Sequence, residues 1–181
     1  MEDLVVQWFA MRATYRRELL AKQQMEQHGI KCFIPMQYKF LVVAGKRKRM
    51  LVPAVHSLIF VQTDKATIQE FKRTRSYLQY MTSVSADGTR VPVIVPDRQM
   101  EAFIKIASTC DEGLMYIEGG QANLAKGTRV RIVEGPFAGA EGVLAKVAGV
   151  RDKRVIVSLE GLVSIAAAHV PPEHLEVVQN K

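Results

Sequence analysis

The chain has 181 residues, 48% of them hydrophobic and 24% charged, so it can build a globular core in one medium domain or two small ones. No apolar run approaches the roughly 20 residues of a membrane span, and no basic leader opens the chain, so we expect no membrane association. The two cysteines, Cys32 and Cys110, lie far apart, which favours the reducing cytoplasm with both thiols free.

The net charge of +7 is unevenly spread along the chain. Residues 1–108 hold 17 Lys and Arg against 9 Asp and Glu, residues 109–124 hold 3 acidic residues and no basic ones, and residues 125–181 hold 8 against 6. A positive excess of this kind suits phosphate backbones. A basic surface that only keeps the chain soluble is an equal alternative.

The first elements expected are a strand over residues 4–11 and a helix from Thr14, as its cap, to His28, followed by Gly29. Arg16 and Arg17 fall in the first turn of this helix, where positive charge opposes the helix dipole. This mismatch suggests another use for the two charges, although solvated arginines are the alternative.

A second strand over residues 30–35 leads into a hairpin with arms at 38–43 and 50–52. Its tip is expected to carry four consecutive cations, and cations clustered on a protruding tip can contact phosphates or simply be solvated. The four residues are Lys46, Arg47, Lys48 and Arg49.

A continuously apolar run at 58–61 predicts a central strand, and Thr63 or Asp64 can cap a short helix that ends in a basic run. Two strands around a turn at Asp87-Gly88 and a helix opening at Pro96-Asp97 complete this part. The order of elements predicts an α/β sandwich with a mixed or antiparallel sheet. The apolar face expected on the last helix consists of Met100, Phe103, Ile104 and Ala107.

An acidic segment without periodicity, residues 109–124, is predicted to link a first domain, 1–108, to a second, 125–181. Beyond the linker the hydrophobic period stays at two, and five short strands in under sixty residues suit a small barrel. The strands are expected over residues 128–133, 143–147, 155–159, 162–168 and 175–178.

One glycine-rich stretch of the second domain has a specific pattern. Val130 and Ile132 alternate with arginines, Pro136 fixes its own φ, and Gly135 and Gly139 can take positive φ. A simple β-hairpin with a Gly/Pro turn is the alternative. The spacing resembles the KOW motif of the NusG and RfaH transcription elongation factors, which also occurs in some ribosomal proteins. The matching positions are Gly127, Val130, Ile132, Gly135, Pro136, Phe137, Gly139, Gly142 and Val143.

With this motif in place, residues 3–108 resemble the NGN domain of NusG-type factors. The resemblance rests on Trp8-Phe9, on His28-Gly29, on the basic hairpin, and on the segments 32–35, 58–61 and 93–96. The implied fold is α+β: an NGN-type α/β sandwich followed by a five-stranded KOW β-barrel. The segment 92–100 is similar to that of the specialised RfaH and UpxY antiterminators. Most of the family has an aromatic-Pro-Gly-Tyr turn before the central strand, whereas this chain has Val55-His56-Ser57-Leu58.

The resemblance implies a factor that binds RNA polymerase through the NGN domain and suppresses pausing or termination, acting as a monomer. The UpxY likeness implies one long target operon, such as one for surface polysaccharide synthesis. The polymerase-binding candidates are Trp8, Phe9, Arg12, Val55 and Leu58, and of the two aromatics we expect one in the core and one partly exposed. The candidates for the non-template strand or upstream duplex DNA are Arg16, Arg17, Lys46, Arg47, Lys48, Arg49, Arg73 and Arg75.

The implied partner of the KOW barrel is a ribosomal protein, a termination factor or RNA. A ribosome-associated RNA-binding protein is the alternative, although such a protein would not need the first domain. The sequence contains no Walker motif, no GxGxxG and no metal-type spacing of Cys, His or carboxylates. We therefore expect neither an enzyme nor a cofactor.

Overall fold

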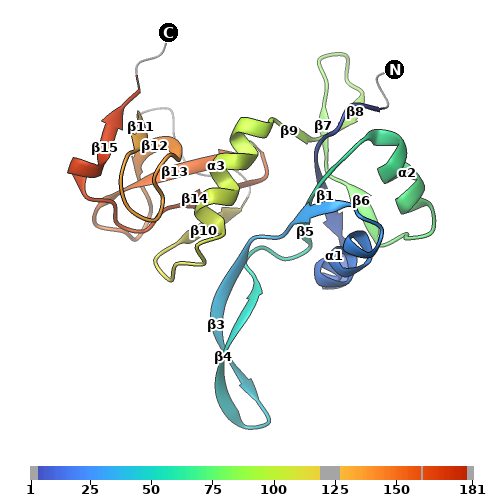
Figure 1. Ribbon diagram of the computed structural model, residues 1–181, viewed down its shortest axis with the longest axis horizontal. Helices are drawn as coiled ribbons and strands as arrows, with labels where there is room; N and C mark the ends of the chain where they lie inside the picture. Colours follow the sequence, from blue (N-terminus) through green and yellow to red (C-terminus); the bar gives the residue numbers. More distant parts are fainter. Residues whose placement is uncertain (1–3, 119–126, 160, 179–181) are drawn as a thin grey trace. The chain divides into compact units, whose positions relative to one another are not determined.

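The computed structural model describes residues 4–118, 127–159 and 161–178. The chain forms two compact units (Figure 1). The first comprises Met1–Pro35 and Pro53–Asp97, and the second comprises Met36–Val52 and Arg98–Lys181. The basic hairpin and most of the last helix therefore group with the C-terminal strands, whereas the sequence places both in the domain 1–108.

The first unit is built on an antiparallel sheet, as the sequence predicts. Its strands follow the order β2 (Lys31–Phe33), β5 (Leu58–Thr63), β1 (Gln7–Ala13) and β6 (Leu78–Tyr80), and β9 (Ile94–Val95) also pairs with β1. The long central strands β1 and β5 are almost entirely buried. Their continuous apolar runs are those of strands covered on both faces.

Two helices and a small hairpin complete this unit. Helix α1 (Glu18–Gln27) contacts β1, β2 and β5, and α2 (Lys65–Arg73) follows β5. Of the two caps proposed for α2, the structure uses Asp64, whose carboxylate accepts a hydrogen bond from the Thr67 amide at 2.8 Å. Hydrogen bonds from Thr67 lower the pKa of Asp64. Strands β7 (Thr82–Val84) and β8 (Arg90–Pro92) flank the expected Asp87-Gly88 turn.

The expected start of the first helix is wrong. Thr14 opens a 3₁₀ turn, Thr14–Arg16, and its hydroxyl donates to the Tyr77 carbonyl instead of capping a helix. Tyr15 and Arg16 have φ of 60° and 54°, in the left-handed region, so α1 starts only at Glu18. Gly29, at φ 69°, lies just beyond the helix end as predicted.

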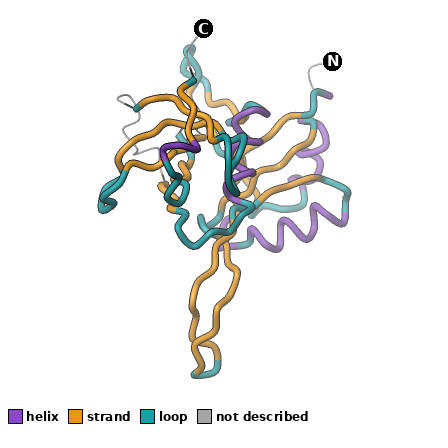
Figure 2. Tube along the Cα trace, turned by 60° about the vertical axis from the view of Figure 1, so that its left-hand side comes forward, coloured by secondary structure: helices purple, strands orange, loops and turns teal. Residues whose placement is uncertain are grey.

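In the second unit, β3 (Met36–Val43) and β4 (Lys46–Pro53) form a narrow two-stranded ribbon (Figure 2). Helix α3 (Asp97–Ala107) buries Met100, Phe103, Ile106 and Ala107. Ile104, which was expected on the apolar face, is half-buried, and Ile106 is fully buried.

Among the described residues the C-terminal sheet has six strands, one more than predicted. Their order is β10 (Met115–Glu118), β14 (Val163–Ala166), β13 (Lys153–Leu159), β12 (Glu141–Lys146), β11 (Thr128–Ile132) and β15 (Leu175–Val177), and a 3₁₀ turn, Pro172–His174, precedes the last. The five predicted strands are all present, within a few residues of their predicted ends.

The sixth strand, β10, lies in the segment 109–124, where no strand was expected; residues 119–124 of this segment lie outside the described residues. Met115 pairs with Ala166 of the neighbouring strand β14. Its side chain packs against a buried cluster of Ala145, Ile156 and Ala166. This apolar contact is the physical reason for the strand, because it offsets the cost of ordering a segment without a strand pattern of its own.

Candidate polymerase and nucleic-acid interfaces

The candidate polymerase-binding residues lie on or next to the two central strands of the first unit. Trp8 and Phe9 are only 3% and 1% exposed, and Val55 and Leu58 are buried as well. Of this set only Arg12 is exposed. The expectation that one of the two aromatics is partly exposed is therefore wrong, because consecutive side chains of β1 point to opposite faces of the sheet and both faces are covered at these positions.

The departure from the family's turn has a visible backbone consequence. Ser57 occupies the position where most relatives are expected to carry glycine, and it has φ of 63°. Its carbonyl accepts a hydrogen bond from the Ala13 amide at 2.8 Å, which connects the turn to the end of β1. The chain thus places a left-handed residue at this position without glycine, at a steric cost.

The four candidate nucleic-acid arginines of the first unit differ in how they are held. Arg75 donates to the Phe71 carbonyl and to Gln24, and its guanidinium lies 3.9 Å from the centre of the Phe71 ring. Its position at the end of α2 indicates a structural role. Arg73 forms an ion pair with Glu70 at 2.9 Å on the exposed surface of the same helix.

Arg16 and Arg17 are exposed beside Tyr15, a residue that no sequence pattern had marked as a candidate. This tyrosine is 86% exposed in the left-handed region, and the Arg17 guanidinium lies 5.8 Å from its ring centre and 5.5 Å from that of Tyr77. Strained backbone at an exposed aromatic residue is a common mark of a binding surface. No pattern in the sequence could reveal it, because the local tetrapeptide reads as the start of a helix.

The basic hairpin differs from its prediction in one respect. The turn itself is Ala44-Gly45, with φ of 50° and 71°, so the four cations lie along β4 and not at the tip. Two consecutive left-handed residues are typical of the two-residue turns that join twisted antiparallel strands. Because side chains alternate along a strand, Arg47 and Arg49 share one face of the ribbon, and Lys46 and Lys48 share the other.

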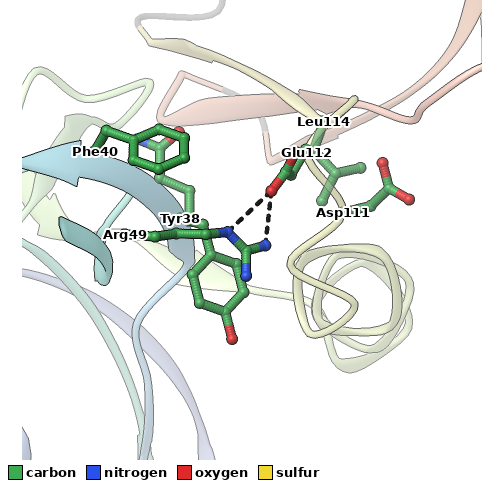
Figure 3. Close-up of a pocket in the computed structure, with 7 residues that line it drawn as sticks. Tyr38, Phe40, Arg49, Asp111, Glu112 and Leu114 are labelled. Carbon is green, nitrogen blue, oxygen red and sulfur yellow. Dashed lines mark hydrogen bonds and ion pairs between the residues drawn. The ribbon is translucent and has the colours of Figure 1, made fainter. Parts of the chain in front are cut away.

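The arginine face of the hairpin borders a pocket (Figure 3). In it the Nε and Nη2 atoms of Arg49 donate to one carboxylate oxygen of Glu112, at 3.0 and 2.6 Å. The Arg49 guanidinium also lies over the Tyr38 ring, 3.8 Å from its centre. The pocket is lined by Gln37, Tyr38, Phe40, Arg49, Asp111, Glu112 and Leu114.

The KOW-like stretch has the geometry that its glycines predict. Gly135 and Gly139 have φ of 86° and 87°, and a Cβ on Gly142 would lie 2.5 Å from the Ile156 carbonyl oxygen of the neighbouring strand. Val130 and Ile132 are buried, as the alternation of β11 predicts. Phe137, in the turn, is buried as well, whereas Pro136 is exposed.

Residues 4–118, 127–159 and 161–178 contain no group of three His, Cys, Asp or Glu side chains that could hold a metal ion. Both cysteines are free, and burial raises the pKa of the Cys32 thiol to about 11. Within the same residues no helix is long and apolar enough to cross a bilayer.

Comparison with known proteins places most of the first unit and most of α3 in one family. The family described as NusG, transcription termination factor nusG, matches residues 6–104, more than half of the chain. No curated protein sequence matches the chain. A solved structure described as "Domain interaction in Thermotoga maritima NusG" is similar at 20% identity and a TM-score of 0.45, covering 97% of this chain and 98% of that chain.

Proposed function

The chain belongs to the NusG family of transcription factors, and we propose that it binds RNA polymerase and suppresses pausing or termination during elongation in the cytoplasm. The family match over residues 6–104 is the observation that carries this proposal, because members of the family generally bind RNA polymerase. The family is typically non-enzymatic. Such a factor acts by binding one conformation of the polymerase more tightly than the paused one, so no bond needs to be made or broken.

We place the polymerase contact on the N-terminal domain, residues 1–108, around Arg12. Trp8, Phe9, Val55 and Leu58 are all buried in the structure, so they can contribute to this contact only by supporting the fold of the domain. A charged residue at Phe9 or Leu58 would therefore act mainly by unfolding the domain. Arg12 is the member of the set that can be tested on a folded protein.

The polymerase proposal predicts that Arg12→Glu weakens pull-down of RNA polymerase from a lysate. Reversing an exposed charge within an interface repels the partner while leaving the fold intact. The matched control is Arg90→Glu, an exposed charge reversal on β8 of the same unit. Equal recovery of polymerase by both folded variants would remove Arg12 from the interface. Recovery of ribosomal subunits in place of polymerase by the wild-type chain would favour the ribosome-associated alternative.

We further propose that the exposed cations of both units contact DNA in the elongation complex, as the non-template strand or the upstream duplex. These cations are Arg16, Arg17 and Arg73 in the first unit and Lys46, Arg47, Lys48 and Arg49 along β4. The support is their exposure and their sign. Arg75, held by Phe71 and Gln24, has the weakest case for a phosphate contact.

We propose that the factor acts on one long operon, such as a surface polysaccharide cluster. We also propose that the KOW-like domain, residues 125–181, recruits a ribosomal protein, a termination factor or RNA. What supports these two points is the resemblance of residues 92–100 to the UpxY type and of residues 127–143 to the KOW motif. Run-through transcription of candidate operons, with and without the protein, measures the first point. Enrichment of one operon over unrelated long transcripts is the expected result.

A further inference from the structure

The β3–β4 hairpin has two chemically different faces. On one face the Arg47 guanidinium lies 4.4 Å from the centre of the Phe40 ring, and the Arg49 guanidinium lies 3.8 Å from that of Tyr38. We call these four residues the aromatic–arginine face. Strand alternation places Lys46 and Lys48 on the opposite face, together with Leu41 and Val43.

The aromatic–arginine face exposes flat groups that nothing in the core requires. Tyr38 and Phe40 remain 41% and 58% exposed even with a guanidinium against each ring. Burying these rings would stabilise the chain, so their exposure on a two-stranded ribbon indicates a partner. Aromatic rings and guanidinium planes are the two side-chain surfaces on which nucleic-acid bases stack.

The positive charge of this face favours a single-stranded nucleic acid over a duplex or an apolar protein partner. Two guanidinium groups beside two rings offer phosphate contacts next to stacking surfaces for bases, which is the combination found in proteins that bind single strands. A duplex keeps its bases stacked inside, so the rings would find no partner there. An apolar protein partner would leave the arginines unpaired.

Arg49 is already paired with one carboxylate in the structure. Glu112 accepts both donors of Arg49 through a single oxygen, as a phosphate oxygen would (Figure 3). The side chains of Arg49 and Glu112 are 46% and 69% exposed, so the ion pair is open to exchange with solvent. Exposed pairs of this kind contribute little stability, and an anionic ligand can displace the carboxylate.

We infer that the aromatic–arginine face binds single-stranded nucleic acid, with bases stacking on Tyr38, Phe40 and the guanidinium planes and with Arg47 and Arg49 contacting phosphates. Glu112 competes with the phosphate for Arg49. This inference rests on the proposed nucleic-acid role of the β4 cations and narrows it to one face and one class of ligand. The opposite face, with Lys46 and Lys48, takes no part in stacking.

The test compares two probes on the full chain: a deoxythymidine strand of about 12 nucleotides and an abasic strand of the same length. Wild type should bind the base-bearing strand more tightly, by roughly fivefold or more for each stacked base. Tyr38→Ser with Phe40→Ser should remove most of this preference without changing the dependence of affinity on salt, because only the guanidinium planes remain for stacking while the phosphate contacts are kept. An oligouridine strand in parallel distinguishes RNA from DNA as the source of the bases.

The matched control is Leu41→Ser with Val43→Ser, which removes apolar area of similar exposure from the opposite face of the same ribbon. This control should keep the preference for the base-bearing strand, whereas general damage to the hairpin would remove it in both variants. Equal binding of the two probes by wild type overturns stacking but leaves the phosphate role of the hairpin intact. No binding of any strand overturns both the inference and the proposed nucleic-acid role.

The proposed competition between Glu112 and phosphate for Arg49 is tested by a separate measurement of affinity. Glu112→Gln should raise the affinity for the base-bearing strand, because the neutral amide holds Arg49 less strongly than the carboxylate does. Asp111→Asn is the neighbouring control, since Asp111 accepts from the Gly113 amide instead of from Arg49. An equal gain in both variants would reflect the loss of one negative charge in general and would refute the competition.

Discussion

At the scale of single residues, Ser57 has a left-handed backbone conformation that a residue with a Cβ rarely adopts. Its φ of 63° costs a residue with a Cβ about 1 kcal/mol or more, and glycine avoids this cost. Ser57→Gly should therefore raise the free energy of unfolding by about 0.5–1 kcal/mol, reduced by the greater freedom of glycine in the unfolded chain. Urea unfolding followed by the fluorescence of Trp8, the only tryptophan and in the same unit, measures it.

His56→Gly is the control for this prediction. His56 is exposed and is not among the non-glycine residues with positive φ, so glycine there brings only flexibility and should lower stability or leave it unchanged. If Ser57→Gly unfolds at a lower urea concentration than the parent chain, the left-handed conformation of Ser57 does not lower the stability of the unit.

Gly142 is the residue at which the KOW-like stretch tolerates no side chain. A Cβ there would meet the Ile156 carbonyl oxygen at 2.5 Å and its carbonyl carbon at 3.0 Å, and backbone cannot move aside as a flexible side chain can. Gly142→Ala should cost about 1–3 kcal/mol, the usual range for overpacking. Faster hydrogen exchange of the β12 and β13 amides is the expected observation.

Gly149→Asn is the companion variant, because the Cβ position of Gly149 has nothing within 4 Å and asparagine tolerates its φ of 78°. Exchange in β12 and β13 should stay close to that of the parent chain. Similar acceleration in both variants would mean that the sheet is sensitive to any change in its turns, not to the close approach at Gly142.

At the scale of elements, Glu141 connects α3 to the C-terminal sheet. One of its carboxylate oxygens accepts from Arg98 on α3 at 2.7 Å, and the other accepts from Arg131 on β11 at 2.9 and 2.6 Å. The hydrogen bond from Arg131, followed by the charge of Arg98, lowers the pKa of Glu141. The contribution of the ionised carboxylate is therefore present above its ordinary pKa of about 4.5 and is lost as the pH falls through the lowered value.

Glu141→Gln should accordingly lower the urea midpoint of the chain at pH 7 and have a smaller effect at an acidic pH, because the contribution of the carboxylate is lost as the pH falls through its lowered pKa. Glu101→Gln, at an exposed position of α3, serves as the control for loss of a surface carboxylate. An effect of Glu141→Gln that is the same at both pH values would point to packing and not to charge.

At the scale of the whole molecule, the positive charge proposed to meet nucleic acid is divided between the two units. Arg16 and Arg17 lie in the first unit, and Arg47 and Arg49 lie in the second. If each pair meets phosphates independently, Gln substitutions at both pairs should flatten the salt dependence of elongation-complex binding by the sum of the separate effects. Each lost contact should remove roughly 0.7–0.9 from the slope of log affinity against log salt.

This prediction is checked by salt titrations of the parent, the two double variants and the quadruple variant. Additive slopes are expected for sites that share no partner. A quadruple variant with the slope of one double variant would show that only one of the two basic regions meets phosphate. Parallel slopes for all four proteins would remove the nucleic-acid role from both regions.

The local features of the chain could be read from its residues. The period-two pattern located all five expected C-terminal strands, Asp64 capped its helix, and the glycines of the KOW-like turn took positive φ, because each of these depends on neighbours within a few residues. The expected position of the hairpin cations was wrong, since the second arm was expected to begin at residue 50 whereas β4 begins at Lys46, directly after the turn at Ala44-Gly45.

By itself the sequence determined the periodicity of the strands, the family, and the concentration of positive charge in residues 1–108, all of which are properties of nearby residues or of sums over them. Only the tertiary structure decided that Trp8 and Phe9 are both buried, that residues 115–118 pair with β14, and that Glu112 meets Arg49, 63 positions away. Burial and pairing between distant segments depend on which surfaces meet after folding. A local pattern does not specify which distant segment will pair with it, because the same alternation of apolar and polar residues suits many possible partner strands.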